Sequence, residues 1–171
     1  MRPVGTALLA TLTTLALAAC SPEAEQPVEE QPRQEFAPGS YEVDPATGET
    51  RAVVNNEDGT TIMRAGETVP PRLPEGFSIY PGAEIRNTIQ IGRDDATGVV
   101  VSLASEDSLA DLVAFYRRQA EAAGVDVAID LKTGAMTTIA GEAPDGTSFA
   151  FQASGATGET TGQLTLRRGL N

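Results

Sequence analysis

The sequence predicts an α+β domain of two layers, in which one helix packs on an antiparallel sheet. Two strand-like runs, at 85–91 and 99–103, precede the only long stretch with helical periodicity, residues 105–124. Four further short runs with alternating apolar residues follow, giving the order ββαββββ; they lie at 125–129, 135–142, 147–154 and 160–168. A single amphipathic helix must bury its apolar stripe against another layer, and the strands provide that layer.

The first 19 residues have the features of an export signal. Met1-Arg2 precede an apolar stretch, Val4 to Ala19, which contains four threonines and is shorter than the roughly 20 residues that a transmembrane helix needs. The stretch ends in Leu17-Ala18-Ala19-Cys20, which resembles the lipobox of bacterial lipoproteins. The resemblance implies cleavage before Cys20 and attachment of a diacylglyceryl lipid and palmitate to this residue. The alternatives are an ordinary secretory signal beside a free thiol, or a short membrane anchor.

Residues 20–40 are predicted to be a lipidated, disordered tether. The segment holds four prolines and five glutamates, with Val28 and Phe36 almost its only large apolar residues. Such a composition buries too little apolar surface to offset the entropy lost on ordering. A flexible chain of this length spans about 25 Å, so the following domain would stay close to the membrane.

Residues 41–72 are predicted to form a β-hairpin extension that ends in a proline-rich connector. Turn sequences at 44–48 and 55–59 separate three short β runs, and prolines follow at 70, 71 and 74. A ribbon of two or three strands is marginal alone, so we expect it to lean on the main domain, residues 73–171.

The helix of the main domain carries recognisable end signals. Ser108 with Asp111 resembles a capping box, and Gly124 suits the C-terminal cap. The strand alternation and the helical stripe together predict a core between helix and sheet; its members are Ile85, Ile89, Val99, Val101, Leu103, Leu112, Val113, Tyr116, Val127, Phe149, Phe151, Leu164 and Leu166.

Composition excludes several classes of function. The chain has 24 acidic and 12 basic residues, so nucleic acid and anionic headgroups repel it. It has no histidine and a single cysteine, which removes the usual nucleophilic and transition-metal sites. We therefore predict no catalytic residues, no metal and no cofactor.

Three short motifs could suggest chemistry, but each suits a turn better. Lys132-Thr133-Gly134 matches a β-lactamase triplet, but no S-x-x-K motif accompanies it. Asn56-Glu57-Asp58-Gly59 and Asp94-Asp95 suit solvated turns better than calcium sites.

Three motifs resemble those of a small bacterial family. They are Leu73-Pro74-x-Gly76-Phe77-x-x-Tyr80-Pro81-Gly82-Ala83, Phe115-Tyr116-Arg117 up to Ala123-Gly124, and Pro144-Asp145-Gly146. The pattern, which covers the chain from about Tyr41, is similar to an uncharacterised family of lipoproteins and secreted proteins of the sphingomonad and erythrobacter type. The resemblance implies a shared fold and carries over no functional residue.

A polar sheet face remains as the candidate interaction surface. Alternation places it opposite the helix, with Arg86, Gln90, Gln152 and Arg167 as the candidate contacts; Thr88, Thr137, Ile139, Ser148, Ala150 and Thr165 are expected beside them. The alternatives are a solvated outer face, or a face covered by the hairpins at 41–63.

The sequence thus indicates a non-enzymatic envelope lipoprotein. Its lipid would hold it in a membrane while the domain contacts an unknown envelope protein or the cell wall. Ser21 follows the cysteine where an aspartate would mark inner-membrane retention, which favours the periplasmic face of the outer membrane. The outer face of a plasma membrane is the alternative. A second hypothesis is a module that binds a small apolar ligand between helix and sheet, in a cavity lined by Tyr116, Phe149 and Leu166.

Overall fold

The computed structural model describes residues 39–170 except 58, 94 and 157. The predicted signal peptide, Cys20 and the tether up to residue 38 lie outside the described residues, whereas Gly39 and Ser40 begin the first strand. No helix in the described part is both long enough and apolar enough to cross a membrane.

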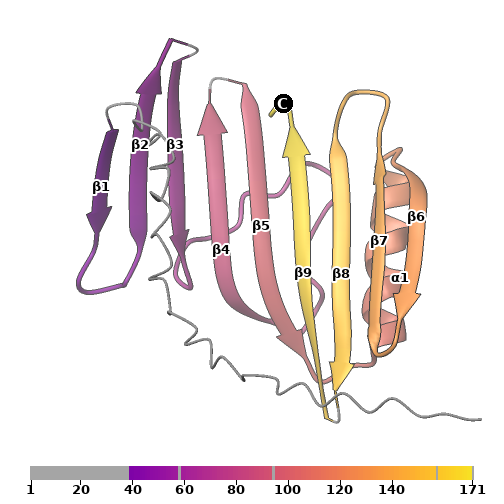
Figure 1. The fold of residues 1–171 in the computed structure, drawn as a ribbon. Coiled ribbons are helices and arrows are strands. Elements are labelled where there is room, and N and C mark those ends of the chain that lie inside the picture. Colours follow the sequence, from indigo (N-terminus) through magenta and orange to yellow (C-terminus); the bar gives the residue numbers. More distant parts are fainter. Residues whose placement is uncertain (1–38, 58, 94, 157, 171) are drawn as a thin grey trace, which may run out of the picture. The chain divides into compact units, whose positions relative to one another are not determined.

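Nine strands form one antiparallel sheet, in the order β1-β2-β3-β4-β5-β9-β8-β7-β6 (Figure 1). The strands are β1 (Gly39–Val43), β2 (Thr50–Asn56), β3 (Gly59–Gly66), β4 (Glu84–Arg93), β5 (Ala96–Ser105), β6 (Asp126–Thr133), β7 (Met136–Glu142), β8 (Ser148–Ala156) and β9 (Glu159–Arg168). The one helix, α1 (Leu109–Ala122), connects β5 to β6.

The predicted α+β class is therefore wrong, because the sheet dominates the fold. The sequence suggested that residues 41–63 form a separate small ribbon, but β3 pairs with β4 from Ile62 opposite Gly92 to Gly66 opposite Thr88. The hairpins thus continue the same sheet and provide three of its nine strands. A 14-residue helix covers only one end of a sheet this wide. Alternation within a strand cannot reveal this, since it does not show which strand lies next in the sheet.

The chain reaches the far edge of the sheet through the helix and then returns. After β5, α1 carries the chain to β6 at the edge, and β7, β8 and β9 follow in turn toward the centre. The last strand closes the gap, because β9 pairs with β5 from Thr97 opposite Arg168 to Ser105 opposite Thr160.

The ends of α1 follow the predicted signals. The Ser108 hydroxyl oxygen accepts a hydrogen bond from the Asp111 backbone N–H at 3.2 Å, and it donates to the Asp111 carboxylate at 2.6 Å. This satisfies one of the free N–H groups of the first turn and places a negative charge near the positive end of the helix dipole. After the cap at Ala123, Gly124 adopts a φ of 81°, which favours glycine and ends the helix.

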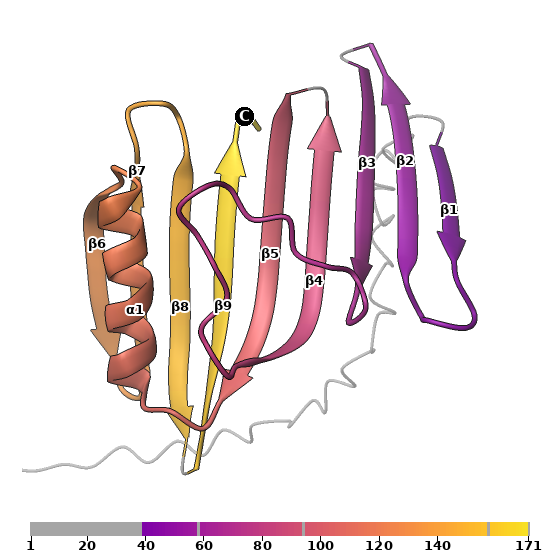
Figure 2. The ribbon, with the colours of Figure 1, turned by 180° about the vertical axis from the view of Figure 1, so that it is seen from behind.

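Two different covers lie on one side of the sheet, which we call the helix side (Figure 2). Helix α1 packs on β6, β7 and β8. The irregular connector between β3 and β4, residues 67–83, passes over the middle strands. Phe77 of the connector stacks on Phe149 with ring centroids 5.8 Å apart. The Ser78 backbone N–H of the connector donates to the Gln119 side-chain oxygen of α1 at 3.1 Å, so the two covers meet, and both contribute to one core.

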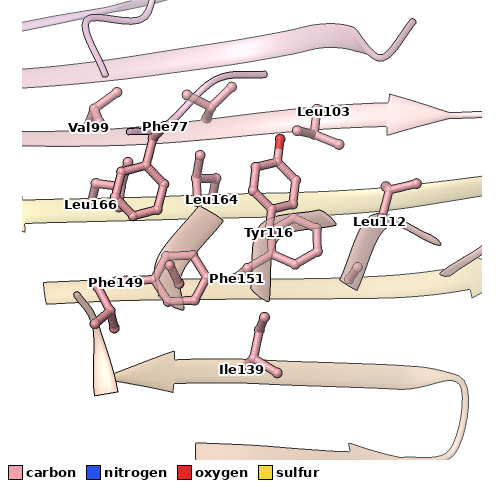
Figure 3. Close-up of a cluster of buried hydrophobic side chains, with 14 of the residues drawn as sticks. Phe77, Val99, Leu103, Leu112, Tyr116, Ile139, Phe149, Phe151, Leu164 and Leu166 are labelled. Atoms are coloured by element: carbon pink, nitrogen blue, oxygen red, sulfur yellow. The ribbon is translucent and has the colours of Figure 1, made fainter. Parts of the chain in front are cut away.

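The core between these covers and the sheet is filled by aromatic and branched side chains (Figure 3). The ring centroids of Tyr116 and Phe151 lie 4.2 Å apart, and both residues are fully buried. Nine predicted core residues are buried, namely Val99, Val101, Leu103, Leu112, Tyr116, Phe149, Phe151, Leu164 and Leu166. Ile85, Val113 and Val127 are partly buried against them.

A β-bulge in β4 changes which of its residues face the core. The register shifts between Ile85 and Asn87, after which Thr88 lies opposite Val101 and Ile89 opposite Val100. Directly paired residues share a sheet face, so Thr88 is on the helix side and Ile89 on the other, which we call the open face. The prediction that Ile89 belongs to the core is therefore wrong.

Candidate functional site

The predicted interaction face does not form as one surface. Gln152 and Arg167 are exposed on the open face, where Gln152 lies opposite Gln163 and Arg167 opposite Ser148. The bulge turns Gln90 to the helix side, where it pairs with Val99. Arg86 lies within the bulge and forms ion pairs of 3.2 Å with Glu84 and Glu159.

Three other residues predicted for this face also lie on the helix side. Thr88, Thr137 and Ile139 are all buried there, and Ile139 belongs to the core. For Thr88 the expectation fails because the bulge in β4 moves every following side chain of that strand to the opposite face. Strand β7 pairs with β8 without a shift, and there Thr137 lies opposite Ala153 and Ile139 opposite Phe151, both on the helix side. Ser148, Ala150 and Thr165 are on the open face beside Gln152, as their pairing partners show.

The hairpins at 41–63 extend the open face and do not cover it. Its exposed large apolar residues lie toward the two edges of the sheet: Tyr41 in β1 is 71% exposed, and Ile129 and Leu131 in β6 are 51% and 56% exposed. The central strands carry polar side chains such as Gln152 and Gln163. None of the three pockets that we describe is lined by Gln152, Gln163 or the exposed apolar residues of β1 and β6.

A groove on the helix side, where neither cover reaches β2 and β3, is the stronger candidate. It has a volume of about 1230 Å³. The sheet contributes one side, through residues of β2, β3, β4, β5 and β9, and the connector, which passes over the sheet (Figure 2), contributes the other through residues 72–75. We call it the arginine groove, because it is lined by Arg51, Arg64, Arg72, Arg93 and Arg168.

The charge of the arginine groove is opposite to that of the whole chain. Five of the 12 basic residues line it, against three acidic ones, Glu49, Glu75 and Asp95. Elsewhere acids predominate, because the chain has 24 acidic residues in all. The groove is therefore a local site of attraction for anions on a protein that otherwise repels them.

One of the three acids is fully engaged within the groove. Arg64 donates to both oxygens of the Glu49 carboxylate, from Nε at 2.6 Å and from Nη2 at 3.0 Å. This bidentate hydrogen bonding lowers the pKa of Glu49 and raises that of Arg64. Glu49 thus neutralises Arg64 and holds its side chain in place.

Two arginines on opposite walls keep their charge available. Arg51, on β2, and Arg72, in the connector, are exposed, and neither forms an ion pair with another described residue. A third arginine, Arg168, forms only a weak ion pair, because its Nη2 lies 3.8 Å from Oδ2 of Asp145. A guanidinium offers several N–H donors in a fixed plane that match a carboxylate or phosphate. The groove can therefore bind an anion from two sides.

Gln90 fixes the connector wall of the groove. Its side-chain oxygen accepts a hydrogen bond from the Arg72 backbone N–H at 2.9 Å, and its amide nitrogen donates to the Arg72 carbonyl at 3.3 Å. This paired contact holds Arg72 over β4. Gln90, expected on the interaction face, is thus a positioning residue for another site.

Apolar side chains lie between the charges of the groove. Ile62 on β3 is 37% exposed, and Leu73 and Pro74 of the connector are partly buried. An occupant that combines negative charge with an apolar side chain would contact both kinds of surface. Sequence reasoning missed this site because its arginines lie far apart in the chain, and nothing in the sequence indicates that they come together.

The hypothesis of an apolar ligand between helix and sheet receives no support from the packing. The residues expected to line such a cavity, Tyr116, Phe149 and Leu166, are at most 1% exposed. The Tyr116 hydroxyl oxygen accepts a hydrogen bond from the Tyr80 backbone N–H at 3.1 Å, so the polar end of this side chain is also satisfied. The pockets that we find in the described residues are not lined by these three side chains.

The sequence motifs with possible chemistry occupy turns. Lys132 and Thr133 end β6, and Gly134, with a φ of 59°, begins the turn to β7. Asp58 and Asp94, from the two calcium candidates, lie outside the described residues. Within the described part, no group of three or more metal-ligating side chains is placed to hold a metal ion.

A scan against models of protein families, a search of curated proteins and a search of solved structures give no match to the chain. The resemblance to small bacterial lipoproteins stays a prediction.

Proposed function

We propose that the protein is a non-enzymatic binding module of the bacterial cell envelope, attached to a membrane through a lipid on Cys20. In this proposal the arginine groove holds an acidic, extended segment of another envelope protein. The observation that carries it is the gathering of five arginines around one groove of a chain that is acidic overall.

The chemistry of the groove favours carboxylates on an extended chain. Arg51 lies on the sheet side and Arg72 on the connector side, and the volume of about 1230 Å³ is much larger than one carboxylate needs. Arginine binds carboxylates in a bidentate manner, as the Arg64 pair with Glu49 illustrates within the same groove. The surrounding negative charge would repel a broad anionic surface and leave only a narrow segment able to enter.

The proposed location follows from the lipobox resemblance and from Ser21 after the cysteine. It is the periplasmic face of the outer membrane, or the outer face of the plasma membrane in a host with a single membrane. We propose no reaction, since Cys20 is assigned to the lipid and the chain has no histidine.

Cell fractionation tests the attachment. With Cys20→Ala the unprocessed precursor should accumulate and incorporation of labelled palmitate should stop. After globomycin treatment the precursor should also accumulate, but it should still carry the label, because the lipid is attached before cleavage. Ser21→Ala is the matched control and should be processed normally. Processing and palmitate labelling that continue without Cys20 would refute the lipid anchor.

Binding of a fluorescent oligo-glutamate peptide tests the groove. We expect Arg51→Ala/Arg72→Ala to raise the Kd about tenfold, because each exposed charge pair contributes up to about 1 kcal/mol. The control, Arg118→Ala/Lys132→Ala, removes the same charge from exposed residues that do not line the groove and should bind nearly as well as the wild type. An equal loss in both variants would show only a general charge effect.

A second arm tests the cell wall as partner. Co-sedimentation with purified peptidoglycan sacculi should show no dependence on Arg51 and Arg72. The cell wall would be the partner if the wild type bound sacculi but not the peptide, and if Arg51→Ala/Arg72→Ala abolished the binding of sacculi.

A further inference from the structure

The apolar side of the sheet changes from one face to the other at β4. The charged residues of β1, β2 and β3 are Glu42, Arg51 and Arg64, and their pairing places them together on the helix side. The open face of these three strands carries no charged residue. In β5 to β9 the arrangement is reversed, because apolar residues such as Phe149 and Leu164 are buried on the helix side. The open face of β1 to β3 is therefore the face suited to burial.

Six large apolar side chains gather on the open face of the first four strands. Tyr41 and Met63 both lie opposite Ala52, and Met63 is also opposite Ile91. The bulge in β4 turns Ile91, like Ile89, away from the covered core. We call this set the apolar patch; it consists of Tyr41, Val43, Val54, Met63, Ile89 and Ile91. The patch is open to solvent at its edge, where Tyr41 is 71% and Val43 46% exposed.

Strands β1 to β3 have no second layer on either face. Helix α1 packs on β6, β7 and β8, at the other end of the sheet. The helix side of β2 and β3 is the arginine groove, and no described element lies over the open face (Figure 1). All five residues of β1 are exposed. A sheet normally buries its apolar face against another layer, so the apolar patch requires a partner.

A second copy of the chain has the shape and the charge that the patch requires. None of the three pockets that we describe is lined by Tyr41, Val43, Met63 or Ile89, so these side chains form no groove for a peptide. A flat face fits another flat face, and two sheets pack about 10 Å apart. The net charge of −12 makes two copies repel each other elsewhere, but the open faces of β1 to β3 bring no charges together. The same acidity disfavours a membrane, because anionic headgroups repel the chain.

The open face offers the area that a dimer needs. A line of paired residues runs from Val43 through Ile89 and Val100 to Ala150 in β8 without meeting a charged residue. The seven strands that it crosses are about 4.8 Å apart and span roughly 34 Å, and about six residues of each cover roughly 20 Å. The product, roughly 670 Å² per copy, is close to the roughly 800 Å² that each partner of a standard interface buries. The dimer should therefore form, but weakly.

We propose that two copies of the protein pack face to face through the apolar patch. Each copy contributes the same patch, and a two-fold axis relates the copies. The contact provides β1 to β3 with the layer that they lack, and the two arginine grooves face outward on opposite sides of the dimer. This inference goes beyond the proposed function, since the patch and the groove lie on opposite faces of the sheet and neither requires the other.

Sedimentation velocity of the unlipidated mature-length chain, with Cys20→Ser, tests the dimer. We expect reversible association with a Kd of roughly 100 µM, because the interface is small. Val43→Lys/Val54→Lys should raise this Kd at least about tenfold, since the contact would bury two unpaired charges. Both residues are exposed in the single chain, so the substitutions should leave the fold intact.

Ile129→Lys/Leu131→Lys is the matched control. It makes the same change of charge on the same face, at exposed residues of β6 outside the patch, and should change the Kd by less than about twofold. Tyr41→Lys is a second patch variant and should also weaken the dimer, while circular dichroism checks that each variant folds. A chain that stays monomeric at about 1 mM overturns the proposal. Equal weakening in the patch and control variants also overturns it.

Paramagnetic relaxation between two copies locates the contact. Because Cys20 is the only cysteine, Cys20→Ser with Asn56→Cys gives a single site for a nitroxide label, beside the patch at the end of β2. This chain is mixed with an isotope-labelled chain that carries no nitroxide. We expect broadening of the backbone amide signals of Met63 and Ile89 in the second chain. Broadening centred on the connector near Arg72, or on α1, overturns the face-to-face arrangement.

Salt dependence distinguishes this inference from the proposed function. Between about 0.01 M and 1 M salt the Debye length falls from about 30 Å to about 3 Å. Two acidic copies then repel each other less, so the Kd of the dimer should fall several-fold, whereas the oligo-glutamate peptide should bind the groove more weakly. Peptide binding that depends on Arg51 and Arg72 in a chain that never dimerises refutes the dimer alone. Dimerisation through the patch without that arginine dependence refutes the proposed function alone.

A membrane is the other possible occupant of the patch. Co-sedimentation with phosphatidylcholine vesicles should show no binding of the unlipidated Cys20→Ser chain. If a monomeric chain bound these vesicles and Val43→Lys/Val54→Lys abolished the binding, the patch would belong to lipid and the dimer would be refuted.

Discussion

The two halves of the sheet differ in what lies on their helix side. Over β5 to β9, α1 and the connector bury a continuous set of aromatic and branched residues, among them Phe149 and Phe151. Over β2 and β3 the same side carries Arg51, Arg64 and the exposed Ile62. Both halves share one hydrogen-bonded sheet, so the presence of a cover decides whether a strand face becomes core or binding surface.

The charge of each half follows from this difference. A buried arginine without a partner would be very costly, and the covered half has none among its core residues. The uncovered half can keep several, because solvent reduces their repulsion. Substitutions and pH changes in the two halves should therefore have different effects.

Removing an aromatic ring from the core of the covered half should cause the largest loss of stability. Phe151→Ala is expected to lower the free energy of unfolding by about 3–5 kcal/mol, because Phe151 is fully buried against Tyr116. Tyr41→Ala, in the exposed first strand, should change it by no more than about 0.5 kcal/mol. Urea unfolding followed by circular dichroism measures both. Similar losses would show that the two halves are equally packed.

High pH should destabilise the covered half through Tyr116. Desolvation by burial raises the pKa of Tyr116 to about 12, from an ordinary value of 10.0. Between these values the unfolded chain loses the proton and the folded chain keeps it, so stability is full below pH 10 and falls as the pH rises. We expect a loss of about 2 kcal/mol by pH 12. Tyr116→Phe should flatten this decline.

Tyr80 should account for the loss of stability at high pH that remains in the Tyr116→Phe variant. A hydrogen bond with Asp107 raises the pKa of Tyr80, followed by desolvation, which acts in the same direction as the shift at Tyr116. The Tyr116→Phe variant should therefore keep a weaker decline. An unchanged decline in this variant would exclude Tyr116 as its main source.

Thr88 marks the border between the halves, and its replacement should stabilise the protein. Its side chain is fully buried, and its hydroxyl oxygen has no hydrogen-bond partner among the described residues. Thr88→Val replaces the hydroxyl with a methyl group of similar size and should raise the free energy of unfolding by about 1 kcal/mol. Thr137→Val is a comparison at another buried threonine. A loss of stability in Thr88→Val would indicate that the hydroxyl has a partner, such as a buried water.

Acid should have the smallest effect, and it should act on the uncovered half. The hydrogen bonds from Arg64 lower the pKa of Glu49 below its ordinary value of 4.5. The pair therefore stabilises the fold above this pH, and its contribution is lost as the pH falls through the lowered pKa. Glu49→Gln should reduce the urea midpoint slightly at neutral pH and not at all in strong acid. A difference that persists in strong acid would contradict the ion-pair explanation.

Local features were the part of the fold that could be predicted. Strand alternation placed Phe149, Phe151, Leu164 and Leu166 on one face, and all four are buried. The Ser108 and Gly124 signals gave the two ends of the helix. These features depend on a few neighbouring residues, so the sequence determines them without knowledge of the rest of the fold.

The candidate site could not be predicted from the same patterns. The bulge before Asn87 moved Gln90 to the helix side, and an alternating pattern gives no sign of one inserted residue. Arg51 and Arg168 are far apart in the chain and line one groove only because β1 to β3 join the sheet and the connector stops short of them.

By itself the sequence determined the lipobox resemblance, the acidic character, the strand runs and the capped helix, because each is a property of adjacent residues or of composition. Tertiary structure alone decided that three more strands extend the sheet and that an arginine groove opens on its uncovered part. The physical reason is that backbone hydrogen bonds along a strand edge accept any neighbouring strand, so side-chain alternation specifies a face but not a partner.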